Sequence, residues 1–364
     1  AVRKSLLAPI QCAYPDGTLP ATNDCWYFTG ILGECCHGVP PASDFYEIAY
    51  ALYGDPAFAT TLHRAYQAVP RDSVYALLFG AETLPPVPLP ARTSVNLPES
   101  GLAILRPADD VDLLLKYGPH GAGHGHPDKL SLSGWAYGWR FSPDLGTPGY
   151  GVASLETWYR QTLSHNTVLI DGESQPPAHG RLERFEPNLV VAAVEWEGVK
   201  LRRTVHGRSG YFVDVFEVDC LTPRRIDWIY HNAGGLTSDS PARAVESIAG
   251  GVAYQHLSGI SERVVSGPML LQWRENSFGL TLCMPGIVGE QVFTGLSPAN
   301  PPAMRYGFVL RRRDASHAVF VSVLHPCRES PLVLKAEFLE NGSLLVHVSG
   351  HTERWTAEQL SGGS

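Results

Sequence analysis

Residues 210–220, GYFVDVFEVDC, are rich in aromatic and β-branched side chains, and runs of this kind decide the fold of the chain. Such a composition is typical of β-strands. Similar runs follow one another without intervening helices at 101–107, 111–118, 130–139, 188–196, 225–233, 269–275, 278–286, 306–313, 317–325, 332–340 and 344–350. A long series of strands at this spacing predicts a mainly β fold of antiparallel sheets, arranged as a sandwich or as stacked sheets.

The segment before the strands has helical character. Residues 43–82 contain three short runs typical of helices, SDFYEIAYALYG, DPAFATTLHRAYQ and DSVYALLFGAE. Residues 84–98, LPPVPLPARTSVNLP, are too rich in proline for a helix or an inner strand. We therefore expect two units, residues 1–92 and residues 93–364, that meet in this proline-rich segment.

Composition limits the class of protein. The 364 residues carry a net charge of −8 with only 28 basic residues, which argues against nucleic acid as a partner. An anionic sugar remains open as a ligand, through a local cluster of arginine, histidine and metal. No apolar run approaches the length of a membrane helix, so we expect no membrane partner. The N-terminus has neither a signal-peptide core nor a methionine, which predicts a processed or excerpted chain.

The cysteines form an odd set without the CxxC spacing of a thiolate zinc site. They are Cys12, Cys25, Cys35, Cys36, Cys220, Cys283 and Cys327. We interpret them as reduced thiols, which weakly favours a cytoplasmic setting over a periplasmic one.

A glycine-rich loop, HGAGHGHPDK at 120–129, carries the chemistry that stands out most. His124 and His126 are two apart, and on an extended chain both imidazoles face one side. Asp144 follows a strand and His165 stands at the start of another. If hairpins bring His126, Asp144 and His165 together, two nitrogens and one oxygen form a set that suits zinc with an open fourth position.

Simpler interpretations stay open at this stage. A lone histidine is more often a structural residue than a ligand, and we interpret His120 and His179 as surface or loop histidines. Asp128 and Lys129 fit a solvated turn or a local ion pair. The run HGHPDK also half-matches HxHxDH, the dinuclear-metal motif of metallo-β-lactamase-like hydrolases, but Lys129 replaces the last histidine and the αββα alternation is missing. The sequence contains no GxSxG elbow and no phosphate-binding loop.

Four ordered motifs together carry a family resemblance. They are YPDGTLPATND, YGPHGAGHGHPDKLSL, SPDLGTPGYG and WYRQTLSHNTVLIDGESQ. The chain resembles the heparinase II/III-like polysaccharide lyases, particularly the branch of oligoalginate lyases and exo-acting glycosaminoglycan lyases. The resemblance implies an α/α toroid followed by antiparallel sheets, so that residues 1–92 are the end of the toroid with its linker. It also implies that the other catalytic residues belong to toroid segments upstream of residue 1, in the same or another chain.

The resemblance assigns roles to individual residues. His126, Asp144 and His165 match the family's zinc ligands, beside the active cleft. His124 matches the histidine that projects into the cleft, and Tyr150 matches a cleft-facing tyrosine, although a sheet tyrosine at the surface is the plainer interpretation. On this view the two loop histidines are neighbours with different roles.

The implied reaction is β-elimination on a uronic acid. The C5 proton becomes acidic when donors neutralise the adjacent carboxylate, a base removes it, and an acid protonates the departing C4 oxygen. His124 suits neutralisation or proton transfer because its ordinary pKa lies near neutrality. Arg160 and Arg181 are candidates for binding the substrate. Arg160 can equally be packed along its stem, and Arg181 with Arg184 fits a solvated face better than an acidic-sugar subsite.

We therefore predict the C-terminal portion of a lyase for an acidic polysaccharide or oligosaccharide, with oligoalginate first and a glycosaminoglycan such as heparan sulfate, chondroitin or hyaluronan second. A homodimer is compatible with the sequence. The alternative from another class is a non-catalytic carbohydrate-binding sheet module that keeps zinc for stability.

Overall fold

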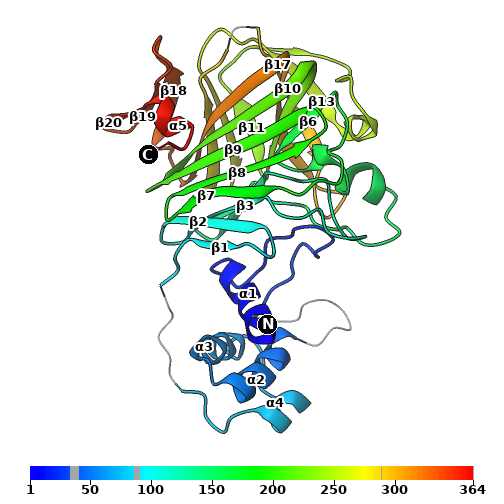
Figure 1. The fold of residues 1–364 in the computed structure, drawn as a ribbon, viewed down its shortest axis with the longest axis vertical. Coiled ribbons are helices and arrows are strands. Elements are labelled where there is room, and N and C mark those ends of the chain that lie inside the picture. The colour runs from blue at the N-terminus through cyan, green and yellow to red at the C-terminus, as the bar shows by residue number, and fades with distance from the viewer. Residues whose placement is uncertain (33–40, 86–90, 288, 364) are drawn as a thin grey trace.

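The computed structural model describes residues 1–32, 41–85, 91–287 and 289–363. Helices α1 to α4 occupy one end of the elongated molecule and the β-sheets the other (Figure 1). Cys35 and Cys36 lie outside the described residues. The helical segments are α1 (Val2–Cys12), α2 (Ala42–Tyr53), α3 (Pro56–Ala65), α4 (Val74–Phe79), η1 (Leu155–Tyr159), η2 (Thr162–Ser164), η3 (Val252–His256) and α5 (Ala357–Leu360). None of these helices is long and apolar enough to cross a membrane.

Strands make up most of the chain after residue 94. They are β1 (Val95–Leu97), β2 (Leu102–Ala108), β3 (Val111–Lys116), β4 (Ser131–Ala136), β5 (Trp139–Phe141), β6 (Val168–Ile170), β7 (Arg181–Glu186), β8 (Leu189–Trp196), β9 (Val199–Arg208), β10 (Tyr211–Asn232), β11 (Gly235–Ser238), β12 (Ala242–Ala244), β13 (Ser258–Arg263), β14 (Met269–Glu275), β15 (Phe278–Met284), β16 (Gln291–Pro298), β17 (Arg305–Arg328), β18 (Val333–Phe338), β19 (Leu344–Val348) and β20 (His351–Trp355). The predicted mainly β fold is confirmed.

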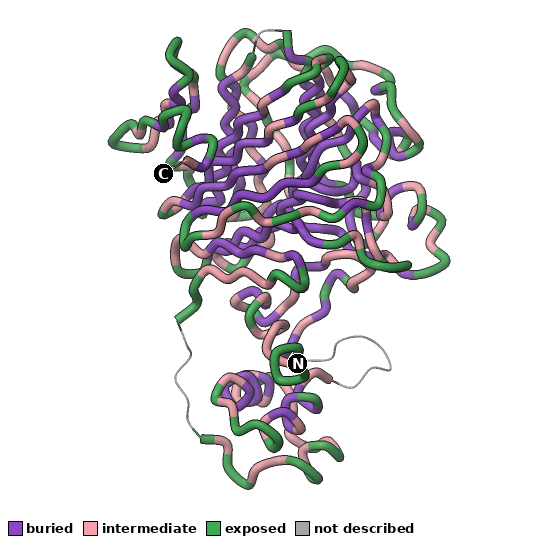
Figure 2. Tube along the Cα trace, viewed as in Figure 1, coloured by how far each residue is buried: buried purple, intermediate pink, exposed green. Residues whose placement is uncertain are grey.

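The strands form three antiparallel sheets within the described residues. One has the order β1-β2-β3-β4-β5, a second joins twelve strands around β10 and β17, and a third has the order β18-β19-β20. The five-stranded and twelve-stranded sheets share one large apolar core, whose fully buried members include Phe141, Trp158 and Trp228. Buried residues concentrate in these layers, whereas the helical end has far fewer (Figure 2).

Five of the predicted strands have different limits in the structure. The runs at 210–220 and 225–233 are one strand, β10, which continues through a register shift between Asp219 and Arg224. The runs at 306–313 and 317–325 likewise form the single strand β17. A bulge accommodates extra residues without ending a strand, so the interruption between two runs does not mark a strand end here. Conversely, the run at 130–139 is a hairpin, β4 and β5, with its turn at Tyr137 and Gly138.

The helical end reaches into the sheets through its own loop. The predicted boundary at residue 92 lies between α4 and β1. Residues 13–32, however, leave α1 and run along the sheets, where Trp26 forms a bridge with Thr147. The Thr147 N–H donates to the Cys25 carbonyl at 3.0 Å. This loop therefore places side chains from the first unit beside the loops of the second.

Candidate active site

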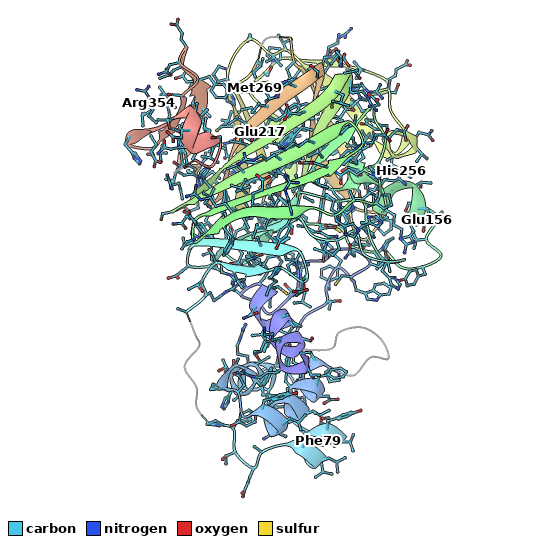
Figure 3. All side chains as sticks on the ribbon, in the orientation of Figure 1. Phe79, Glu156, Glu217, His256, Met269 and Arg354 are labelled. Atoms are coloured by element: carbon cyan, nitrogen blue, oxygen red, sulfur yellow. The ribbon has the colours of Figure 1, made fainter. Side chains whose placement is uncertain are left out.

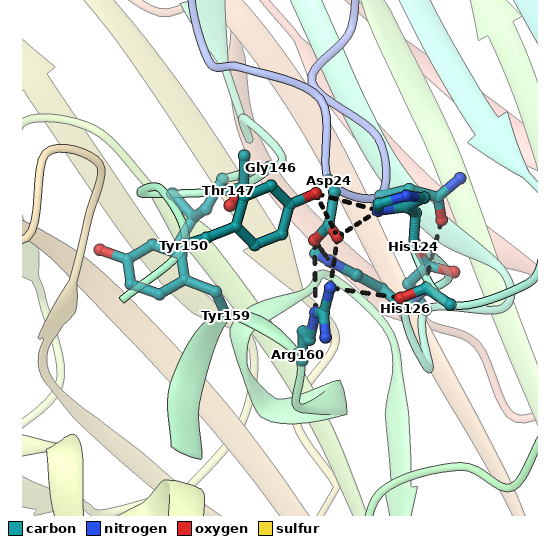
Figure 4. A network of polar contacts seen from close by, with 12 residues as sticks. Asp24, His124, His126, Gly146, Thr147, Tyr150, Tyr159 and Arg160 are labelled. Carbon is teal, nitrogen blue, oxygen red and sulfur yellow. Dashed lines mark hydrogen bonds and ion pairs between the residues drawn. The ribbon is translucent and has the colours of Figure 1, made fainter. Parts of the chain in front are cut away.

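Three segments meet where the residue 13–32 loop crosses the sheets. Figure 4 shows Asp24 from that loop facing His124 and His126 from the glycine-rich loop, with Tyr150 and Arg160 on the other side. The Asp24 N–H also donates to the His124 carbonyl at 3.3 Å. Segments about 100 residues apart in sequence are therefore held together by both backbone and side chain.

Two glycines permit this close approach. Gly146 has a φ of 56°, and a Cβ on it would lie 2.1 Å from the Cys25 carbonyl oxygen of the crossing loop. A Cβ on Gly125 would lie 2.0 Å from the His120 carbonyl oxygen. Any larger residue would clash with backbone at both positions, so these glycines set the geometry of the site.

The Asp24 carboxylate is the centre of the polar network. Its Oδ2 accepts hydrogen bonds from His124 Nδ1 at 2.9 Å and the Tyr150 hydroxyl at 3.2 Å, and its Oδ1 accepts from His126 Nε2 at 3.0 Å. Arg160 forms an ion pair with both oxygens. Burial alone would raise the pKa of Asp24, but hydrogen bonds from Arg160, His126 and His124 hold that pKa well below its usual range.

The outer side of the network is open to solvent. The His124 side chain is 75% exposed and Tyr150 is 62% exposed, whereas the Asp24 side chain between them and the core is 4% exposed. The Tyr150 hydroxyl lies 2.9 Å from His124 Nδ1. Desolvation and the Asp24 carboxylate raise the pKa of Tyr150, so its phenol is protonated at neutral pH. A histidine and a protonated phenol in contact can exchange protons with a ligand.

The inner side holds the predicted metal ligands. The side chains of His126 and His165 are fully buried, and their ring centroids lie 5.4 Å apart. Asp144 Oδ1 lies 3.3 Å from His165 Nδ1. The structure therefore places Asp144 beside His165, and His165 beside His126. His165 follows η2 and precedes β6 by three residues, so its predicted place at the start of a strand is slightly wrong.

Three imidazole nitrogens of this inner group lack hydrogen bonds within the described residues. They are His126 Nδ1, His165 Nδ1 and His165 Nε2, all buried. Of these, His165 Nδ1 has the Asp144 carboxylate as an ion-pair contact at 3.3 Å. Burial lowers the pKa of His126, and the nearby His165 lowers it further, so the His126 ring is neutral. Buried nitrogens without donors or acceptors are costly unless a ligand binds them, so the donor set fits a divalent cation.

Asp128 is a second carboxylate at the inner group. One ligand atom each from His126, Asp128 and His165 lies within 4.8 Å of the others. The Asp128 oxygens, however, pair with Lys129 Nζ at 2.9 Å and with Lys116 Nζ. Asp144 accepts a hydrogen bond from the Gly146 N–H and contacts His165 Nδ1, and His165 lowers the pKa of Asp144 against the effect of burial. Asp144 has more free lone pairs for a cation, whereas Asp128 is already neutralised.

The prediction of a solvated turn at Asp128 and Lys129 is wrong. Both residues are fully buried, and the side chain of Lys116 is only 4% exposed. They do form the local ion pair that was the other expectation. A buried carboxylate that balances two lysines beside uncharged imidazoles explains why these polar residues can lie inside the sheet domain.

The two candidate arginines differ in their surroundings. Arg160 contacts Asp24 and also Glu156 at 2.9 Å, and its side chain is 21% exposed. Glu156 and His256 lie on the same side of the sheets in Figure 3. Arg181 on β7 instead pairs with Glu183 of the same strand at 3.1 Å and with Glu195 of β8 at 2.8 Å, and its side chain is half exposed. Within the described residues, Arg181 has no contact with the Asp24 network, so its role in substrate binding stays a prediction.

Asp24 and its neighbour Asn23 were not assigned a role from the sequence. Asn23 Oδ1 accepts from the His126 N–H at 3.3 Å and from Lys116 Nζ. A residue about 100 positions away cannot be paired with a histidine by spacing. The available signal was the motif YPDGTLPATND, which ends in Asn23 and Asp24.

Comparisons with known proteins agree with this architecture. Residues 89–255 match the family model described as Heparinase II/III-like, C-terminal. A heparin-sulfate lyase of Bacteroides stercoris is 28% identical over 133 residues, which cover 35% of this chain and 20% of that protein. A heparinase III gene product with methylated lysines has a TM-score of 0.67 and 20% identity, covering 94% of this chain and 50% of that chain. For a heparan sulfate lyase of Pedobacter heparinus the TM-score is 0.62 and the identity 16%, covering 97% and 52%. The chain thus spans about half the length of these two structures, which show the fold.

Proposed function

Residues 89–255 are a heparinase II/III-like, C-terminal domain, as the resemblance predicted, and on that premise we propose that the protein is a polysaccharide lyase. The proposed reaction is β-elimination in a uronate-containing glycosaminoglycan. Heparan sulfate becomes the first substrate, ahead of the oligoalginate expected from the motifs, because the curated relatives are named heparin-sulfate lyases. The observation that carries the proposal is the exposed pair of His124 and Tyr150 anchored on Asp24.

The geometry supports His124 as the group that removes the C5 proton and Tyr150 as the group that protonates the C4 oxygen. Nε2 of His124 has no hydrogen-bond partner within the described residues and belongs to an exposed side chain, so it can accept the C5 proton. The Tyr150 phenol, protonated at neutral pH, can donate to the C4 oxygen as the C4–O bond breaks. The electrons of the C5–H bond then form the C4=C5 double bond. Because both side chains are exposed, His124 can release the acquired Nε2 proton to solvent and Tyr150 can regain a proton from solvent, which restores the starting state.

Neutralisation of the substrate carboxylate needs further donors. Arg160 is already paired with Asp24 and Glu156, so its role in this proposal is to hold the network. The chain spans about half the length of the heparinase structures that it matches. We propose that the remaining donors come from a toroid segment outside this chain.

Zinc is the metal we propose for His126, Asp144 and His165. Two imidazole nitrogens and one carboxylate oxygen are a ligand set that zinc accepts. When bound, the ion would supply structural cross-linking of the loops that carry these ligands. His165→Ala should reduce the zinc content below one ion per chain, measured by metal analysis, while His317→Ala should leave it unchanged. Full zinc retention in His165→Ala would reject the site.

The decisive assay is the ultraviolet absorbance of unsaturated uronate. The chain and the full-length product of its gene are incubated separately with heparan sulfate, chondroitin sulfate, hyaluronan and alginate oligomers. We expect absorbance to rise first with heparan sulfate and full-length protein. Absence of a signal from both proteins on every polymer would reject the lyase and favour a carbohydrate-binding module that keeps zinc for stability.

A further inference from the structure

One buried carboxylate contacts two histidines through opposite ring nitrogens. Asp24 Oδ2 lies 2.9 Å from Nδ1 of His124, and Asp24 Oδ1 lies 3.0 Å from Nε2 of His126. Arg160 binds both oxygens and compensates the charge of the ionised carboxylate. An ionised carboxylate only accepts hydrogen bonds, so the ring nitrogen that faces it must carry the proton.

The consequence differs for the two rings. A neutral imidazole has one N–H and one lone pair. His124 with its proton on Nδ1 has its lone pair on Nε2, in an exposed side chain. His126 with its proton on Nε2 has its lone pair on Nδ1, which is buried and has no hydrogen-bond partner within the described residues.

We propose that Asp24 is a positioning residue that fixes opposite tautomers of His124 and His126, presenting a proton acceptor to solvent and a metal-binding nitrogen to the core. Carboxylates that orient histidine ligands or bases in this way are common. The part that concerns His124 rests on the proposed function, whereas the tautomers and the metal-binding nitrogen do not.

The fold makes Asp24 suited to this role. The backbone around it is fixed by the contact of its N–H with the His124 carbonyl and by the neighbouring bond from Thr147 to Cys25. Because Asp24 comes from the first unit and both histidines from the second, the tautomers depend on docking of the residue 13–32 loop. If Asp24 only stabilised the docked loop through its ion pair with Arg160, the tautomers of His124 and His126 would not depend on it.

The direct test is nitrogen-15 NMR of the histidine rings, at a pH above the ordinary histidine pKa. In the wild-type chain without zinc we expect a proton on Nδ1 of His124 and on Nε2 of His126. Asp24→Asn should change at least one tautomer, since the amide NH₂ requires an acceptor. Asp24→Glu should preserve both. The matched control is Asp219→Asn, which alters the exposed pair with His317 and should leave His124 and His126 unchanged.

The second test separates catalysis from metal binding in the same variants. For Asp24→Asn we expect kcat to fall about 100-fold or more with a smaller change in KM, because acid–base catalysis contributes about 10²–10⁴-fold. Zinc affinity should fall about 10–100-fold, as for other partners of metal-binding histidines. Asp24→Glu should recover much of both.

Three results would overturn the proposal. One is a wild-type chain whose two histidines share the same tautomer. Another is an Asp24→Asn variant that keeps both tautomers and its zinc affinity. The third is loss of kcat in Asp24→Asn without any change in ring protonation. Should Asp24→Asn fail to fold by thermal unfolding, the wild-type spectrum alone decides. A wild-type protein without lyase activity would reject the proposed function, and the zinc and tautomer measurements would then decide the role of Asp24.

Discussion

His124 and His126 are two residues apart and contact the same carboxylate, yet their side chains are 75% and 0% exposed. The difference arises because the chain turns at this point instead of running extended, although both rings still reach one centre, the Asp24 carboxylate. Gly125 between them fits against backbone where no side chain could. Two histidines of one loop can therefore have different roles. His124 faces solvent, His126 belongs to the buried group of candidate metal ligands, and both contact Asp24.

The largest effect should come from the exposed histidine. In the full-length protein, His124→Ala should lower kcat/KM for heparan sulfate by about 10²–10⁴-fold, since a proton-transfer group is lost. The melting temperature and zinc content should stay close to wild type because the side chain is exposed. Uronate absorbance, thermal unfolding and metal analysis measure the three quantities.

His317→Ala is the matched control, because His317 is also exposed and also contacts a carboxylate through Nδ1. It should leave all three quantities unchanged. If His124→Ala lost zinc or stability as strongly as activity, the contrast between the two loop histidines would not hold.

The next effect concerns the buried side of the comparison. Asp128→Asn removes the carboxylate that balances Lys116 and Lys129 in a fully buried position. Breaking a buried pair leaves uncompensated charge, so the free energy of unfolding should fall by about 3–5 kcal/mol, measured by urea denaturation. Asp219→Asn, at an exposed pair, should change it by less than about 1 kcal/mol. A loss below about 1 kcal/mol in Asp128→Asn would indicate that the lysines are not charged in the folded chain.

A pH dependence should distinguish buried from exposed histidines elsewhere in the sheets. Burial lowers the pKa of His206 and of His231 to about 4. An unfolded histidine binds its proton near about pH 6.5. Between these values the unfolded state holds more protons, so the free energy of unfolding should fall as the pH drops from about 6.5 to about 4.

Replacement of the buried ring tests this assignment. His231 contacts the Ser297 hydroxyl at 2.8 Å and the Leu163 carbonyl at 2.7 Å. His231→Gln should reduce the slope of unfolding free energy against pH in that interval, although it lowers stability at neutral pH. His317→Gln should keep the slope of the wild type. Equal slopes in both variants would exclude His231 as a source of the pH dependence.

The sheets were predictable because strand composition is a local property. The runs around Phe212 and Phe320 lie in β10 and β17, which pair antiparallel. Composition could not distinguish a bulge from the end of a strand, because Leu221, Thr222 and Pro223 are exposed and a proline is disfavoured inside a sheet. Strand identity was therefore better predicted than strand limits.

The site was predictable only in part, for a related reason. Motifs indicated His124, His126, Asp144, Tyr150 and His165, and the structure places them in one region. The contact between Asp24 and His124 spans 100 residues of sequence, and it depends on how the first unit docks. Burial of Lys129 likewise depends on the whole sheet domain. Long-range packing decides such positions, and a local pattern carries no information about it.

The smallest effect is expected at Arg181. In the structure this arginine, on the outer strand β7, pairs with Glu183 of β7 and Glu195 of β8, and its side chain is 52% exposed. Exposed pairs contribute about 0–1 kcal/mol, so Arg181→Gln should change the free energy of unfolding by less than about 1 kcal/mol. The KM for heparan sulfate should stay within about twofold, because the charge is already neutralised by two carboxylates. A clear rise in KM at unchanged kcat would instead support the substrate-binding role predicted from the sequence. It would also extend the substrate-binding surface from the Asp24 network to β7. The contrast between the exposed His124 and the buried His126 would then apply to an exposed face of the sheet domain and its buried interior.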